Sequence, residues 1–150
     1  MNVGKCCIHD VVAVSPKDDL AFAAQIMRDK HIGFLVVAEN TGNRRMPVGV
    51  LTDRDIVVQA VARNAEPRSI MVGDVMTRDP VIVKESDDLE EAMTRLRNNG
   101  IRRVPVVDER GALVGVVAVD DAIRLLSGML SDIAGAVSRE QWVERTLRAG

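Results

Sequence analysis

Hydrophobic and polar positions follow the same order twice along the chain. In each half, a short β-branched run leads into polar residues typical of a helix N-cap, and then into apolar residues spaced i, i+3, i+4, i+7. Two continuous apolar runs follow, typical of buried strands, and a short helical pattern ends each half. This order predicts two β-α-β-β-α units, with strands at 11–14, 32–38, 48–51, 80–83, 104–107 and 113–117, helices at 20–27, 53–62, 89–96 and 120–126, and turns at 39–47 and 108–111.

Direct comparison of the two halves indicates that they are copies of one unit. A shift of 69 residues gives 12 identities among the 36 pairs from residue 3 to 38, and a shift of 66 gives 4 among the 10 pairs from 48 to 57. A unit of this size buries only a limited fraction of its surface alone, so we expect the copies to pack on each other. We expect repeat 1 at 3–62, a linker at 63–71, repeat 2 at 72–126 and a C-terminal helical tail at 127–150.

The tail has no counterpart in the first copy. Leu126, Leu130, Ile133 and Val137 keep helical spacing, and a second apolar cluster surrounds Trp142. Such a segment serves equally well as a helix packed back on the body and as a helix that binds a partner or forms a dimer. The sequence leaves both interpretations open.

Composition narrows the classes of partner. The 150 residues carry a net charge of −2, with 47% hydrophobic and 28% charged residues, which is typical of a globular protein. Aromatic residues make up only 2%, so the chain lacks the stacking platforms that single-stranded nucleic acid requires. Acidic and basic residues nearly cancel, so no global field attracts a phosphate backbone. We expect no nucleic-acid partner, and any anion site must be local.

The N-terminal region and the hydropathy pattern suggest neither a metal site nor a membrane segment. Cys6 and Cys7 are adjacent, which disfavours a disulfide between them, and no second cluster completes a metal site with His9. No stretch approaches the length of a membrane span. We expect a cytoplasmic protein without a membrane partner and without a bound metal.

Thr52 and Asp55 form the first candidate binding motif. Thr52 ends a predicted buried strand at the N-cap of the next helix, where its hydroxyl and free N–H groups suit a phosphate. Asp55, three residues later, offers a carboxylate that suits the paired hydroxyls of a ribose. The same Thr-x-x-Asp pattern is also an ordinary capping arrangement. The second copy keeps the carboxylate as Asp121 but has Ala118 in place of the threonine.

Arg102 and Arg103 form the second candidate motif. They stand directly before a predicted buried strand, at the end of the sheet, and the planar guanidinium group suits phosphate. Ordinary surface charge is the alternative interpretation. The first copy has Gly33 and Phe34 at these positions, so the unit itself does not require the arginines.

These motifs resemble a known family. The stretches 75–81, 100–108 and 115–117 look like a CBS (cystathionine-β-synthase) domain, and 18–38 with 49–56 looks like another. Together they are similar to a tandem CBS pair, or Bateman module, over about 1–126. The resemblance implies an α/β (α+β) fold of two units packed sheet to sheet about a pseudo-twofold axis, with two clefts. It also implies a homodimer and an adenosine-containing ligand: AMP, ADP, ATP, S-adenosylmethionine or NAD.

The resemblance assigns roles to single residues. It implies that Asp55 holds a ribose, that Thr52 holds a phosphate, and that Arg102 and Arg103 reach this cleft from the other copy. Arg54 is a weaker phosphate candidate. The adenine is expected against aliphatic groups of the strand that opens each copy, near residues Val14, Val81 and Ile82.

The second cleft is expected to bind phosphate less well. It contains Asp121 but has Ala118 where the motif requires a hydroxyl, and it receives Gly33 and Phe34 instead of arginines.

Three functions are compatible with this pattern. A regulatory module would bind a nucleotide and transmit its occupancy to a separate protein partner, which the sequence does not identify. An enzyme is disfavoured, because no phosphate-binding loop, dinucleotide turn or metal-protease motif is present, and His9 and His31 are the only histidines. A nucleotide-insensitive structural or interaction protein is the third possibility. We therefore predict a regulatory ligand rather than a catalytic cofactor.

Overall fold

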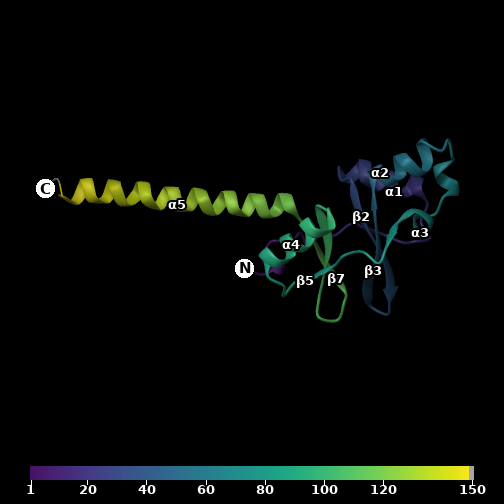
Figure 1. Ribbon diagram of the computed structural model, residues 1–150, viewed down its shortest axis with the longest axis horizontal. Coiled ribbons are helices and arrows are strands. Elements are labelled where there is room, and N and C mark those ends of the chain that lie inside the picture. The colour runs from purple at the N-terminus through teal and green to yellow at the C-terminus, as the bar shows by residue number, and fades with distance from the viewer. Residues whose placement is uncertain (149–150) are drawn as a thin grey trace.

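Two β-sheets form the body of the protein, and one long helix leaves it (Figure 1). The computed structural model describes residues 1–148. The first sheet has the order β1-β2-β3-β4 and the second β5-β6-β7, and β3 lies against β7 where the sheets meet. The strands are β1 Ala13–Val14, β2 Phe34–Thr41, β3 Arg44–Thr52, β4 Thr77–Arg78, β5 Val83–Lys84, β6 Arg103–Val107 and β7 Leu113–Ala118.

The helices begin where the sequence places capping residues. Asp19 and Asp88 are the N-caps of the two long body helices, and their carboxylates accept hydrogen bonds from Phe22 N and Glu90 N. Both helices end at a residue in the left-handed conformation, which reverses the chain into the next strand. The helical segments are η1 Val3–Lys5, α1 Leu20–Lys30, α2 Asp53–Ile56, a π-helical turn Val57–Val61, η3 Pro67–Ser69, α3 Val72–Val75, α4 Leu89–Asn99 and α5 Val119–Arg148.

The segment that opens the first copy lies on the second half of the body. The N–H of Val3 donates to the carbonyl of Asp87 at 2.9 Å, and Ile8 forms an antiparallel bridge with Val116 of β7. The first eight residues therefore pack on the second half, and Ile8 makes an isolated bridge to its sheet.

The segment that opens the second copy makes the reciprocal contacts. The N–H of Val72 donates to the carbonyl of Asp18 at 2.8 Å, and Thr77 of β4 pairs with Val50 of β3. Each of these residues matches its counterpart in the first copy at the shifts of 69 and 66. The two copies are thus related by a pseudo-twofold axis and exchange their opening segments.

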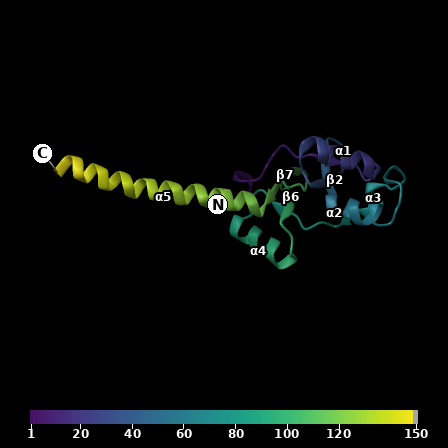
Figure 2. The same cartoon turned by 90° about the horizontal axis from the view of Figure 1, so that it is seen from above.

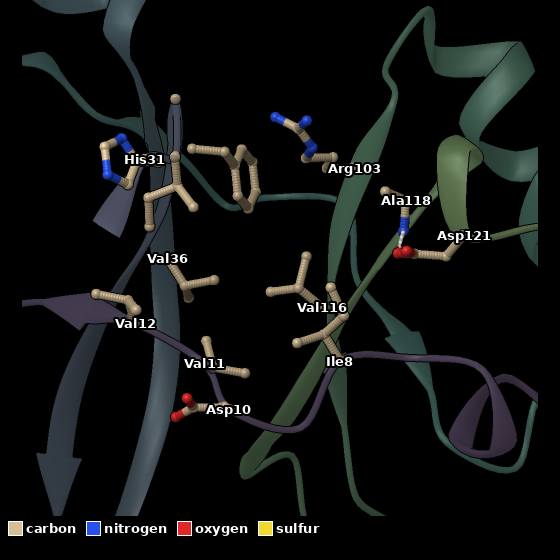
Figure 3. A pocket seen from close by; sticks show the side chains of 13 residues that line it. Ile8, Asp10, Val11, Val12, His31, Val36, Arg103, Val116, Ala118 and Asp121 are labelled. Atoms are coloured by element: carbon tan, nitrogen blue, oxygen red, sulfur yellow. Dashed lines mark hydrogen bonds between the residues drawn. The ribbon is translucent and has the colours of Figure 1, made fainter. Parts of the chain in front are cut away.

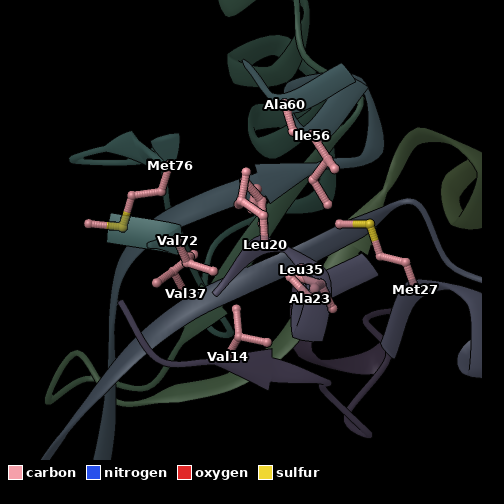
Figure 4. Packing of buried hydrophobic residues seen from close by; sticks show 11 residues of the cluster. Val14, Leu20, Ala23, Met27, Leu35, Val37, Ile56, Ala60, Val72 and Met76 are labelled. Atoms are coloured by element: carbon pink, nitrogen blue, oxygen red, sulfur yellow. The ribbon is translucent and has the colours of Figure 1, made fainter. Parts of the chain in front are cut away.

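Each half has its own hydrophobic core, and the exchange links the two. Val72 and Met76 lie in the core of the first half, and Val3 and Cys7 lie in the core of the second. Figure 4 shows the first core, in which side chains from α1, β2 and the exchanged segment meet. Folding of one half therefore requires a segment of the other.

The expected fold of two sheet-packed β-α-β-β-α units is confirmed, but several local expectations are wrong. The strands expected at 11–14 and 80–83 are shorter, because β1 is only Ala13–Val14 and β5 only Val83–Lys84. The turn expected at 39–47 is mostly strand, because β2 runs to Thr41 and β3 starts at Arg44. The helix expected at 120–126 continues unbroken to Arg148, so the expected boundary at 127 falls inside α5. Residues 149–150 of the expected tail lie outside the described residues.

Most of α5 projects away from the body instead of packing back on it (Figures 1 and 2). Only Asp121 and Ala122, in its first turn, are buried. No helix within residues 1–148 is both long enough and apolar enough to cross a membrane.

Candidate functional site

A cavity of about 750 Å³, called site A here, lies where α2 starts and the chain enters β6. The first half contributes the end of β3 and the start of α2, and the second half contributes the segments before β5 and β6. The polar and charged residues that line it are Thr52, Asp53, Arg54, Asp55, Thr77, Asp79, Arg102 and Arg103. Site A thus brings together the hydroxyl, the carboxylate and both arginines that the sequence singled out.

A second cavity of about 250 Å³, called site B here, lies at the pseudo-equivalent position (Figure 3). Each residue that lines it has its counterpart, at the shift of 69 or 66, among the residues that line site A. Ala118 and Asp121 of site B correspond to Thr52 and Asp55 of site A. The two sites therefore share one backbone framework and differ in side-chain chemistry.

Thr52 and Asp55 are joined by a reciprocal capping box at the start of α2. Thr52 Oγ1 accepts from the N–H of Asp55 at 3.2 Å, and Asp55 Oδ2 accepts from the N–H of Thr52 at 2.8 Å. Among the described residues, Asp55 Oδ1 has no hydrogen-bond partner, so it is available to an incoming hydroxyl. The capping interpretation of this motif is therefore confirmed, and the capping arrangement also fixes the two side chains beside the cavity.

Arg102 and Arg103 converge on one carboxylate, that of Asp120. Arg102 Nη2 lies 2.8 Å from Asp120 Oδ1, and Arg103 Nη2 lies 3.9 Å from Asp120 Oδ2. The Arg102 side chain is 75% exposed and that of Asp120 is 44% exposed, so this pair contributes little to stability. The arginines are therefore free to turn towards an anion in site A.

Asp121 in site B is more fully engaged than Asp55. Its side chain is buried, and Oδ2 accepts from the N–H of Ala118 at 3.1 Å (Figure 3). Its other oxygen, Oδ1, lies 3.1 Å from Arg124 Nη1. Ala118 has no hydroxyl to complete the capping box. A ribose at site B would have to displace Arg124 or share Asp121 with it.

Gly33, Phe34 and Arg103 line both sites. Gly33 and Phe34 lie at site B as the resemblance implied, but they also form part of site A. Arg103 gives site B one arginine, which the sequence analysis missed, because it considered only the residues that arrive from the opposite copy.

The expected adenine contacts are only partly at the cavities. Val81 lines site A. Val14 is buried in the core of the first half, inside β1, and lines neither cavity. Ile82 lines a separate surface cavity beside Pro16 and Met76, and not site A. The side chains that reach the sites come from the residues just before β1 and β5.

Sequence reasoning also missed an acidic residue in each cavity. Asp79 lines site A and Asp10 lines site B. The two were visible as an identical pair in the repeat, and that identity was the signal that could have identified them. Asp79 adopts a positive φ of 47°, which lets the chain turn from β4 into site A.

The cysteines lie away from both cavities. Cys7 is buried in the core of the second half, and this burial raises the pKa of its thiol. The His9 ring lies within hydrogen-bonding distance of the carbonyl oxygens of Gly4 and Val114. Within residues 1–148, no three His, Cys, Asp or Glu side chains are grouped as a metal site would require.

The sequence agrees with one protein family over most of its length. The family model for the CBS domain matches residues 3–61 and 72–128. The chain belongs to the CBS domain family. The two matched segments coincide with the two copies that exchange their opening segments and form sites A and B.

Three similar proteins illustrate the range of the family. The uncharacterized protein MK0525 of Methanopyrus kandleri is 28% identical over 94% of this chain and 70% of its own length. The CBS domain pair of protein MJ0100, solved with 5′-methylthioadenosine and S-adenosyl-L-methionine, has a TM-score of 0.74 and 25% identity, covering 86% of this chain and 98% of that one. CBSX2, solved with AMP, has a TM-score of 0.72 and 27% identity, covering 85% and 97%.

Proposed function

We propose that this protein is a regulatory CBS pair that binds an adenine nucleotide of the AMP, ADP or ATP class at site A. The observation that carries the proposal is the convergence at one cavity of a free carboxylate oxygen, a hydroxyl and two arginines. Neither half alone supplies this set. A ligand that contacts both halves therefore favours the arrangement that makes all of these contacts at once.

Each part of the nucleotide has a matching group in site A. Asp55 Oδ1 accepts hydrogen bonds from the ribose hydroxyls, and the Thr52 hydroxyl with the start of α2 faces the phosphate. Arg102 and Arg103 supply the charge that neutralises the phosphate, with Arg54 at the rim. The adenine packs on the aliphatic part of the cavity, at Val81, Pro80 and Ile101.

The relatives support an adenosine-containing ligand and leave its identity open. MJ0100 was solved with two adenosine derivatives and CBSX2 with AMP. S-adenosylmethionine carries no phosphate and has a positive sulfonium centre, which two arginines disfavour. This argues for a phosphorylated ligand, and NAD remains in the comparison because it also carries phosphates.

Occupancy is transmitted through α5. Its first turn contains Asp120, which pairs with the site A arginines, and Asp121, which lines site B. A phosphate that binds Arg102 and Arg103 breaks their ion pairs with Asp120. The electrostatic field at the start of α5 changes as a result. A partner that binds α5 then distinguishes the occupied from the empty state. We propose that this occurs in a cytoplasmic homodimer, without catalysis.

A nucleotide-insensitive interaction module is the alternative, and the exposed apolar face of α5 favours it. The two proposals make opposite predictions for a pull-down of partners repeated with and without nucleotide. Nucleotide-dependent capture supports the regulatory function, and identical capture supports the alternative.

Calorimetry of the full chain with AMP, ADP, ATP, NAD and S-adenosylmethionine tests the proposal. We expect binding of a phosphorylated adenosine compound, weakened roughly 5- to 150-fold by Asp55→Ala through lost hydrogen bonds to a charged group, about 1–3 kcal/mol. Asp55→Asn is the matched variant, because its amide oxygen can still accept from the N–H of Thr52 and retain the cap. Lack of binding by every compound at millimolar concentration would refute the proposal.

A further inference from the structure

One face of α5 carries large apolar side chains that the body does not cover. Ile123, Leu126, Leu130, Ile133 and Val137 are between 50% and 67% exposed. Their spacing alternates between three and four residues, an average period of 3.5, which is the period of a left-handed coiled coil. Helices that pack on their own body have similar spacing, but here the body leaves every one of these side chains at least half exposed.

The surroundings of the stripe suit a second helix. Ala122, Ala136, Ser127 and Ala134 flank it and are small, so another backbone can approach closely. Between residues 122 and 138 the only charged residues are Arg124 and Asp132, and the alternation places both off the stripe. A large apolar surface with few charges marks an interaction site.

We propose that α5 pairs with α5 of a second copy of this chain, in an antiparallel two-helix seam. Continued by the same alternation, the stripe reaches Glu140 and Glu144. A parallel pair in register would set each glutamate against its own copy, which repels. An antiparallel pair with Leu130 opposite Ile133 separates the two copies of each glutamate along the seam. Glu140 then lies next to Arg124 of the second copy, which contacts Asp121 of its own chain but whose side chain is 76% exposed, so opposite charges approach each other.

The same alignment extends the contact beyond the stripe. A groove of about 500 Å³ runs between α4 and the start of α5, lined by apolar side chains that include Leu89, Met93, Ala122, Leu125 and Met129. With Leu130 opposite Ile133, the groove residues Ala122, Leu125 and Met129 lie level with positions 141, 138 and 134 of the second copy, so this part of its α5 runs alongside the groove. The contact has twofold symmetry and is therefore made twice.

Sedimentation of the full chain without nucleotide tests the seam. We expect a concentration-dependent dimer, and we expect Leu130→Lys to raise the dissociation constant Kd of this dimer at least tenfold. Ser131→Lys is the control, because it adds the same charge one residue later, off the stripe. Far-UV circular dichroism should show that both variants stay folded, since neither position packs on the body. A wild-type monomer, or a dimer that Leu130→Lys leaves intact, would overturn the proposal.

Disulfide trapping tests the orientation. In the antiparallel pair, the two copies of position 126 lie roughly 16 Å apart along the helices, too far for a disulfide, whereas 126 lies opposite 137. We expect the double variant Leu126→Cys/Val137→Cys to form a covalent dimer and Leu126→Cys alone not to, with the wild-type chain as the reference for Cys6 and Cys7. Trapping by the single variant would overturn the antiparallel arrangement. Because no nucleotide is involved, a failure here is distinct from a failure of site A to bind.

Discussion

Asp120 Oδ1 lies 2.8 Å from Arg102 Nη2, so the second residue of α5 pairs with an arginine of site A. Asp120 stands where the first copy has Arg54, at the shift of 66. The Asp120 carboxylate therefore pairs with the Arg102 guanidinium group, to which a phosphate in site A would otherwise bind. The two copies have opposite charges at this position, and in the proposed function this difference couples site A to the start of α5.

Replacing Asp120 by asparagine should strengthen nucleotide binding. The competing charge is removed, and because the pair is exposed its contribution is about 0.2–1 kcal/mol, so we expect AMP to bind roughly 1.4- to 5-fold more tightly. Calorimetry with adenosine is the control, since a ligand without phosphate should show no change. Weaker AMP binding, or an equal gain for adenosine, would contradict this role of Asp120.

Arg102 and Arg103 should differ in which cavity they serve. Arg102 lines site A alone, whereas Arg103 lines both sites. We expect Arg102→Gln to weaken AMP binding about tenfold at site A only, and Arg103→Gln to weaken any phosphate ligand at both sites. Titrations analysed for two sites separate these outcomes. Arg97→Gln removes an exposed arginine from the end of α4 and should leave affinity unchanged.

Ala118→Thr should give site B the hydroxyl that it lacks. Ala118 stands at the position of Thr52, and its N–H already donates to Asp121 at 3.1 Å, so a threonine can complete the capping box. We expect a gain of stability of about 0.5–2 kcal/mol in urea unfolding. We also expect a second, weaker phosphate site in calorimetry. The control Ala118→Val has a similar volume without a hydroxyl, and an equal effect of both variants would show that shape alone acts.

Much of this architecture could be predicted because its causes are local. Apolar spacing gave the order of strands and helices, and the N-cap residues Asp19 and Asp88 mark the starts of α1 and α4. The residues of site A followed from the repeat together with the family resemblance. That Thr52 and Asp55 lie together in one cavity with Arg102 and Arg103 was therefore predictable before any coordinates.

Two kinds of feature could not be predicted from the sequence: strand ends that are exposed to solvent, and contacts made by the backbone alone. The outer ends of β2 and β3 carry Glu39, Asn40, Arg44 and Arg45, which show no apolar alternation because both faces meet solvent there. The exchange of opening segments depends on main-chain hydrogen bonds, which leave no side-chain pattern. The continuity of α5 was missed because the segment after residue 126 has no counterpart in the first copy, and the boundary was placed where the repeat ends.

The exchange of opening segments explains two glycines and provides a test of the fold. A Cβ added at Gly115 would lie 2.7 Å from Cys7 Sγ and 3.1 Å from the carbonyl oxygen of Ile8, and one added at Gly49 would meet Met76 and Thr77 in the same way. Backbone oxygens held in a sheet cannot retreat without loss of pairing.

We therefore expect Gly115→Ala to lower the free energy of unfolding by about 1–3 kcal/mol in urea. Gly128→Ala is the matched control, because its Cβ meets nothing within 4 Å on the exposed helix α5. There the alanine should stabilise the chain slightly, by up to about 1 kcal/mol, through helix propensity. Equal stability of the Gly115→Ala variant and the wild-type chain would mean that residues 3–8 do not pack on β7 in solution. That result would also contradict the reciprocal exchange of the opening segments.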